Sequence, residues 1–247
     1  MTDFASDDPP TVLVPVRVLE GQALPETLAA FLAPADVVVL GYHVLPEQTP
    51  AEQASMQFEE RARSAVEDIA GAFRDAGGEA ETRVAFTHDR DQTVERVAAE
   101  VGATAILLPN PVGDVDDVLV AVRGAIDTGR LADLVATLVA EGTQRVTVLG
   151  VTTGADFDAD AAVDDVRDRL RARGVAAARI TTETAVSERP VADVVARSAE
   201  FDAVVTGESE ETLWSILVGD EPERVAEGAV APVLVVRRDR ATESTSG

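Results

Sequence analysis

The chain has 247 residues, 46% of them hydrophobic, and it carries 45 acidic against 21 basic side chains, for a formal net charge of −24. Every basic residue is arginine. Cysteine is absent, which excludes a disulfide framework and a cysteine nucleophile. The two histidines, His43 and His88, alone give little support for a zinc site. The negative charge argues against nucleic acid and anionic lipid as partners. An acidic surface without lysine predicts adaptation to concentrated salt, where the Debye length falls to about 3 Å at 1 M.

The N-terminal residues 1–10 form an acidic tail without the basic region and apolar core of a signal peptide. No apolar run in the sequence approaches the length of a membrane span, about 18 residues. We therefore expect a cytoplasmic protein that does not insert into a membrane.

Two segments of the chain repeat each other closely. Thr11–Arg17 reads TVLVPVR, and Asp117–Arg123 reads DVLVAVR. Short apolar runs rich in β-branched residues are typical of strands buried on both faces of a parallel sheet. The elements that follow also match between the two copies, in the same order. The expected helices are 25–32 with 129–140, 58–73 with 163–170, and 91–101 with 190–199. The expected strands are 36–42 with 145–151, 81–87 with 178–185, and 104–108 with 202–206.

Alternating strands and helices predict an α/β protein made of two tandem, doubly wound parallel sheets of Rossmann-like type. We expect the first domain at 11–114 and the second at 115–238, followed by a flexible tail at 239–247. The second copy continues through a loop and helix at 207–231 to a fifth strand at 232–237. The first copy has only residues 109–116 in that place, which is too short for a loop, a helix and a strand.

These features resemble the universal stress protein family in its tandem form, over nearly all of residues 11–237. The resemblance implies that both domains have the adenine nucleotide alpha hydrolase-like form of the Rossmann-like fold. In that family the fourth strand leads into a loop of pattern Gly-x2-Gly-x9-Gly followed by Ser or Thr, then a helix and an apolar strand. Here the corresponding segment runs from Thr206-Gly207 through Gly219-Asp220 to the strand Pro232–Arg237. His43, at the end of the second strand, is similar to a common feature of the family. Together with the composition, the resemblance implies a halophilic archaeon as the source.

The sequence departs from the ATP-binding branch of that family at several positions. That branch has an aspartate at the end of the first strand, where this chain has Arg17 and Arg123. Glu210 stands at the second glycine position, the spacing to Gly219 is one residue short, and Asp220 replaces the hydroxyl residue. Phosphate loops work because backbone N–H groups converge on the anion, and carboxylates at such a loop oppose it. We therefore interpret the loop as a degenerate nucleotide-binding motif.

The candidate ligand site lies in the crevice of the second domain, because ligands of doubly wound sheets bind beyond the carboxyl ends of the strands. Arg17 and Arg123 either bind an anion or form ion pairs with nearby acids, and the sequence leaves both interpretations open. The candidate ligand-binding residues are Val122, Arg123, Gly124, Gly207, Gly219 and Asp220.

Two further groups of residues are weaker candidates. His43 and His88 could form a proton relay or a metal pair, although a histidine at a strand end is more often structural. Asp156, Asp158 and Asp160 alternate like part of a calcium loop, but they lack its glycine and its distal glutamate, so a solvated acidic loop is favoured. We expect no catalytic residue and no metal site.

The leading hypothesis is a non-catalytic, universal stress protein-like regulatory or stress-response protein without a cofactor, ATP or AMP being disfavoured. The alternative is a sensor of a nucleotide or other small ligand that uses the second-domain crevice and regulates a transporter. A weak nucleotide hydrolase is the third hypothesis, although no base, metal site and nucleophile occur together. The expected partners are the two copies for each other within the chain, a second chain in a homodimer, and a protein partner that the sequence does not identify.

Overall fold

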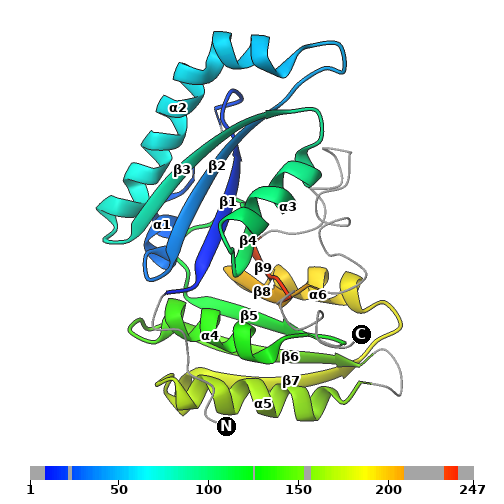
Figure 1. Ribbon diagram of the computed structural model, residues 1–247. Coiled ribbons are helices and arrows are strands. Elements are labelled where there is room, and N and C mark those ends of the chain that lie inside the picture. The colour runs from blue at the N-terminus through cyan, green and yellow to red at the C-terminus, as the bar shows by residue number, and fades with distance from the viewer. Residues whose placement is uncertain (1–8, 22–23, 125, 153–156, 209–230, 239–247) are drawn as a thin grey trace, which may run out of the picture. The chain divides into compact units, whose positions relative to one another are not determined.

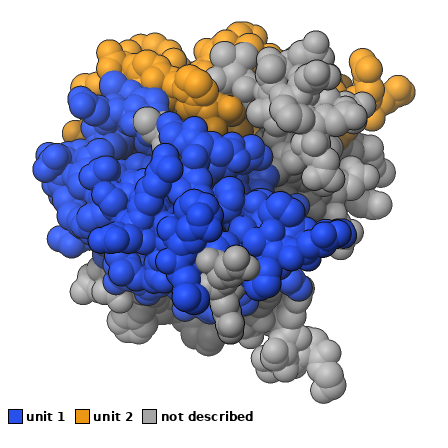
Figure 2. Space-filling view, turned by 90° about the horizontal axis from the view of Figure 1, so that it is seen from above, with its two compact units in different colours: residues 1–106 blue, residues 107–247 orange. Residues whose placement is uncertain are grey.

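The computed structural model describes residues 9–21, 24–124, 126–152, 157–208 and 231–238. The chain divides into two compact units, residues 1–106 and 107–247, which Figure 2 shows in different colours. Strands and helices alternate along both units (Figure 1). Among the described residues, every helix is too short or too polar to cross a bilayer.

The first unit is a parallel sheet with helices on both faces. Its strands lie in the order β3-β2-β1-β4, and all three pairings are parallel. Strand β1 is buried along its apolar run, as a central strand covered on both sides must be. The elements are β1 (Thr11–Arg17), α1 (Glu26–Leu32), β2 (Asp36–Val44), α2 (Ala51–Asp75), β3 (Glu79–Thr87), α3 (Arg90–Glu100) and β4 (Ala105–Leu108).

The second unit repeats this strand order and adds one strand. Its strands lie in the order β9-β8-β5-β6-β7, and all four pairings are parallel. The α/β, Rossmann-like architecture predicted from the sequence is thus confirmed. The elements are β5 (Asp117–Val122), α4 (Thr128–Val139), β6 (Arg145–Thr152), α5 (Ala159–Ala172), the 3-10 turn η1 (Ala177–Arg179), β7 (Ile180–Val186), α6 (Pro190–Ser198), β8 (Ala203–Gly207) and β9 (Val233–Val236).

A glycine in the second strand of each unit lets a helix approach the sheet closely. A Cβ atom on Gly41 of β2 would lie 2.2 Å from Cγ1 of Val66 in α2. A Cβ atom on Gly150 of β6 would lie 2.7 Å from Cγ2 of Val163 in α5 and 2.9 Å from the carbonyl oxygen of Ala159. All three distances are below van der Waals contact, so a glycine allows close helix packing at the equivalent strand in both units.

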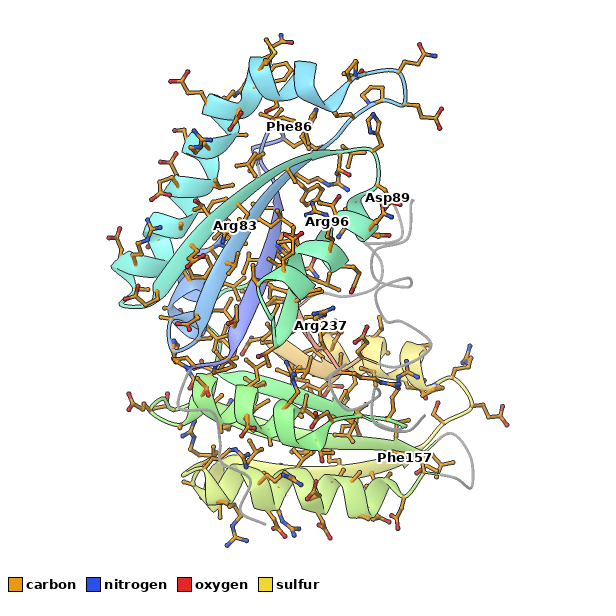
Figure 3. The ribbon with its side chains drawn as sticks, viewed as in Figure 1. Arg83, Phe86, Asp89, Arg96, Phe157 and Arg237 are labelled. Atoms are coloured by element: carbon orange, nitrogen blue, oxygen red, sulfur yellow. The ribbon has the colours of Figure 1, made fainter. Side chains whose placement is uncertain are left out.

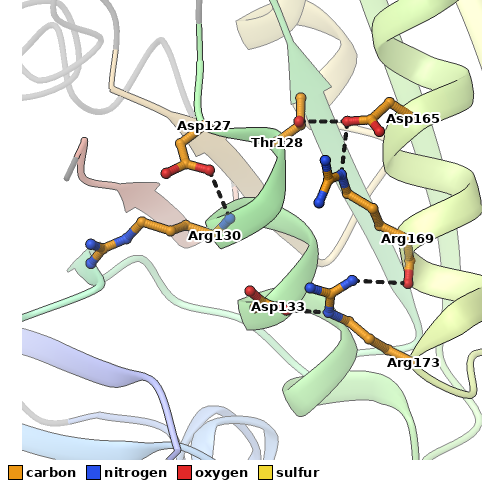
Figure 4. A network of polar contacts seen from close by, with 7 residues as sticks. All are labelled: Asp127, Thr128, Arg130, Asp133, Asp165, Arg169 and Arg173. Carbon is orange, nitrogen blue, oxygen red and sulfur yellow. Dashed lines mark hydrogen bonds and ion pairs between the residues drawn. The ribbon is translucent and has the colours of Figure 1, made fainter. Parts of the chain in front are cut away.

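A polar network holds α4 against α5 on one face of the second unit (Figure 4). The Thr128 hydroxyl donates to Asp165 at 2.6 Å, and Arg169 Nε donates to the same carboxylate oxygen at 2.8 Å. Arg173 donates to Asp133 of α4. Partial burial raises the pKa of Asp165, but the hydrogen bonds from Thr128 and Arg169 outweigh it, so the net pKa is lowered. The carboxylate therefore stays ionised in the folded protein.

The seventh strand begins later than the sequence predicts. A strand was expected at 178–185, whereas residues 177–179 form η1 and β7 begins at Ile180. The reason is Arg179, whose guanidinium donates to the carbonyl oxygens of Val139, Ala140 and Gln144. The contacts with Val139 and Ala140 satisfy carbonyl groups at the end of α4, which need partners outside the helix. The turn places Arg179 where it can reach them.

Candidate functional site

The carboxyl ends of β5, β8 and β9 meet at one edge of the second unit. In the parallel register Ala121 pairs with Thr206, and Gly207 pairs with Val236. Continued by two residues from the first pair and by one from the second, this register puts Arg123, Glu208 and Arg237 at equivalent positions on three neighbouring strands. The hydrogen bond from Glu208 N–H to the Val236 oxygen, 2.7 Å long, extends the ladder to this row. The edge is where ligands bind on doubly wound sheets.

Four of the six predicted site residues lie together at this edge. Val122 is fully buried, and Arg123 is 9% exposed at the end of β5. Gly124 has a φ of +60°, a left-handed conformation that favours glycine. A Cβ atom on Gly207 would lie 2.7 Å from two carbon atoms of Ile126, so the chain passes there without a side chain. The other two predicted residues, Gly219 and Asp220, lie outside the described residues.

The edge also contains two arginines that the sequence argument did not include. Arg237, labelled in Figure 3, is 8% exposed at the end of β9. The backbone N–H of Arg238 donates to Glu208 Oε2 at 3.1 Å, and Arg238 Nε donates to the Glu208 carbonyl oxygen at 3.2 Å. The sequence does contain a sign of them, because Arg237 and Arg238 directly follow the apolar run of the last strand. That they belong to the candidate site follows only from the pairing of β9 with β8, which residue spacing alone does not reveal.

The corresponding edge of the first unit has an arginine with an internal acidic partner. Arg17 Nε donates to the Tyr42 hydroxyl at 3.2 Å, and its Nη1 donates to Glu20 Oε2 at the same distance. The hydrogen bond with Tyr42 raises the pKa of Arg17, burial opposes this rise, and the carboxylate of Glu20 adds to it. The guanidinium of Arg90 lies over the Tyr42 ring, 5.6 Å from its centroid. Arg17 thus follows the ion-pair interpretation.

The weaker candidates have structural roles. The His43 ring meets the edge of Phe86 at a centroid distance of 6.4 Å, and His88 Nε2 is 3.0 Å from the Thr49 carbonyl oxygen. Asp158 caps α5 by accepting the Ala161 N–H at 2.9 Å, as aspartate commonly does at a helix start. Within the described ranges, histidine and acidic side chains form no group of three that could hold a metal ion. Asp156 lies outside those ranges.

Known proteins resemble this chain in structure but not in sequence. The sequence matches no protein-family model and no curated protein. The structure is similar to a universal stress protein from Archaeoglobus fulgidus DSM 4304, with a TM-score of 0.60 and 13% identity, over 94% of this chain and 97% of that one. It also matches a universal stress protein in complex with cAMP (TM-score 0.38, 20% identity, 51% of this chain and 98% of that one). A third match is the cytoplasmic domain of a prokaryotic cation chloride cotransporter (TM-score 0.46, 12% identity, 92% and 95%).

The last two scores carry no argument, and at 13% identity the first likeness concerns the fold. The chain has the α/β, Rossmann-like fold of universal stress proteins.

Proposed function

We propose that this chain is a non-catalytic regulatory or stress-response protein that works without a bound nucleotide in the cytoplasm of a salt-adapted cell. The observation that carries the proposal is that Arg17 and Glu208, at the ends of β1 and β8, are bonded to other groups of the chain. Side chains that could receive a phosphate group make contacts inside the chain instead. The two copies of the unit then act as a protein scaffold, and the ligand edge contributes to its stability.

The first unit supports the proposal through Arg17. The nucleotide-binding relatives that the sequence resembles are expected to have an aspartate there, facing the ligand. Arg17 is instead bonded to Tyr42 and paired with Glu20 at 3.2 Å. An exposed pair of this kind contributes little stability, at most about 1 kcal/mol. A triphosphate at this edge would have to compete with Glu20 for the guanidinium.

The second unit supports the proposal through Glu208. Its carboxylate accepts the Arg238 N–H at 3.1 Å and follows directly on Gly207, where the phosphate loop of a nucleotide-binding relative begins. A unit charge about 5 Å from a phosphate charge costs roughly 3 kcal/mol at an effective dielectric of 20, before screening by salt. That repulsion corresponds to about two decades of affinity. The carboxylates expected after Glu208 in the sequence would add to it.

One observation favours the alternative, a sensor of a small anionic ligand. Arg123 follows β5, and Arg237 and Arg238 follow β9, the two strands on either side of β8. Three arginines against Glu208 make the described part of this edge locally basic in a protein whose net charge is −24. A basic region in an acidic protein is a place where a small anion would be concentrated. Regulation of a transporter would then follow from ligand-dependent contacts of the second unit.

Melting temperatures separate the two functions. We expect unchanged melting temperatures when ATP, AMP or cyclic AMP is added at millimolar concentration in molar KCl, with and without Mg²⁺. Arg237→Ala serves as the matched variant, because it removes a guanidinium from the candidate edge. A saturable increase in the parent that is absent in Arg237→Ala would support the sensor and contradict the leading proposal.

A further inference from the structure

Strand β7 is the outer strand of the second unit, with β6 as its neighbour on one side. The Ser187 N–H donates to the Thr152 carbonyl oxygen at 3.0 Å, so the backbone groups of Ser187 point toward β6. Because these directions alternate along a strand, every second residue of β7 points its N–H and C=O away from the sheet. These outward groups belong to Ile180, Thr182, Thr184 and Val186. The Ile180 N–H donates to the Ala177 carbonyl oxygen of the 3-10 turn, and no backbone hydrogen bond within the described part of the chain reaches the outward groups of the other three.

The outer strand of the first unit, β3, is protected in the usual way. Strand β3 carries Glu79, Glu81 and Arg83, and charged side chains on an edge discourage pairing with another strand. Strand β7 reads ITTETAV, and its one charged residue, Glu183, is bonded to Arg197 at 3.0 Å. Most of β7 is nevertheless exposed, including Val186 at 89%. In a strongly acidic protein this edge is unusually neutral.

Helix α5 lies along β6 and β7, with α4 beside it (Figure 1). Its sheet-facing residues Ala159, Val163, Val166 and Leu170 are buried. Asp165, Arg169 and Arg173 are on the side of α4 (Figure 4). With 3.6 residues per turn, the flank opposite α4, toward the β7 edge, carries four charged residues. They read from the N-terminus as Asp160, Asp164, Arg167 and Arg171.

We propose that two copies of this chain associate through this edge, with β7 antiparallel to β7 of the second copy about a twofold axis at Thr182. Such an axis, perpendicular to the sheet, keeps both α5 helices on one face and makes them antiparallel. Because α5 contacts both β6 and β7, it lies roughly 5 Å from the axis. The two α5 helices would therefore be about 10 Å apart, which is an ordinary helix packing distance.

The charges on the flank of α5 are self-complementary in this arrangement. Antiparallel helices that cross between residues 165 and 166 bring Asp160 opposite Arg171 of the second copy, and Asp164 opposite Arg167. Asp160 and Arg171 are both exposed, and neither forms an ion pair with another described residue. Asp164 and Arg167 already pair with each other within the chain at 2.5 Å. Each interface would thus add two Asp160–Arg171 pairs and bring the two Asp164–Arg167 pairs side by side with opposite charges facing. A parallel arrangement would put like charges together.

The charged flank of α5 determines where the axis crosses β7. Gly150 faces the first turns of α5 between Ala159 and Val163, and it pairs with Thr184 of β7. The midpoint of the charged flank lies about 4.5 residues further along α5, which is roughly 7 Å. Since α5 runs opposite to β7, this distance corresponds to about two strand residues, which leads to Thr182. An axis there also puts Glu183 opposite Thr181 instead of a second Glu183.

Disulfide cross-linking tests the strand pairing. Because the chain has no cysteine, a single introduced cysteine can pair only with its counterpart in the second copy. Across the axis the two Cα atoms of residue 182 would be about 5.5 Å apart, within the range of a disulfide. Thr182→Cys should therefore form a covalent dimer on mild oxidation. Val186→Cys is the matched control on the same strand, because two copies of residue 186 would be about 26 Å apart. Equal cross-linking of both variants, or none with Thr182→Cys, would overturn the proposal.

Charge reversal tests the helix contact by sedimentation equilibrium of the full chain in moderate KCl. Arg171→Asp turns two attractive pairs per dimer into repulsive ones and should weaken association about tenfold. The double variant Asp160→Arg with Arg171→Asp restores both pairs in reversed order and should recover the parent affinity. Arg63→Asp, on the exposed surface of α2, should have no effect. A monomeric parent at all concentrations, or no recovery in the double variant, would contradict the proposed interface.

Discussion

Gly150→Ala tests whether the close approach of α5 to the sheet determines the stability of the second unit. The added Cβ atom would lie 2.7 Å from Cγ2 of Val163, 2.9 Å from the Ala159 oxygen and 3.0 Å from the Ala159 Cβ. The Val163 side chain can rotate, but the Ala159 carbonyl is part of the helix backbone, so α5 has to move. Overpacking of this kind typically costs about 1–3 kcal/mol. Alanine recovers part of that cost, about 0.5–1 kcal/mol, because it restricts the unfolded chain.

We expect a net loss of about 1–2 kcal/mol, which lowers the melting temperature by roughly 2–8 °C in a chain of this size. Thermal unfolding followed by circular dichroism in about 2 M KCl measures it. Gly71→Ala is the control, because its Cβ atom would meet nothing within 4 Å. That change should stabilise α2 by up to about 1 kcal/mol. A Gly150→Ala protein as stable as the parent would refute the argument from close packing.

Two further predictions concern charge. In the folded state the pKa of Asp165 is lowered, so its contribution is present above the unfolded value of about 4 and is lost as the pH falls through the folded pKa. Asp165→Asn should therefore cost about 0.5–1 kcal/mol at pH 7, a modest amount because the carboxylate is half exposed, and the difference from the parent should shrink as the pH falls below about 4. The net charge of −24 predicts a higher melting temperature in 2 M than in 0.1 M KCl, and equal values would contradict it.

The sequence was sufficient to predict the fold because its signals are local. The apolar run Thr11–Arg17 is β1 to the residue, and the matching run Asp117–Arg123 is β5 except for its last residue. Glycines 77 and 174 end the long helices in the left-handed conformation, with φ values of +92° and +94°. The predicted start of β7 was wrong by two residues, because Arg179 bonds to carbonyl groups about 40 residues earlier in the chain. A contact over that separation leaves no periodic pattern.

The candidate site could be predicted only in part, because its residues come from different strands. Val122, Arg123, Gly124 and Gly207 adjoin recognisable strand ends, which is why the sequence argument included them. Arg238 meets Glu208 at a separation of 30 residues, and only the adjacency of β8 and β9 brings them together. The sequence also did not reveal the self-complementary charges on the flank of α5, because it does not show which side of that helix packs against α4.

Calorimetric titration of the full chain with Mg-ATP in about 2 M KCl tests the central claim most directly, because it measures the competition between phosphate and the internal acidic groups at the strand ends. We predict no detectable heat of specific binding and a dissociation constant weaker than millimolar. A saturable isotherm with a micromolar dissociation constant would contradict the claim that Arg17 and Glu208 have been turned to internal contacts.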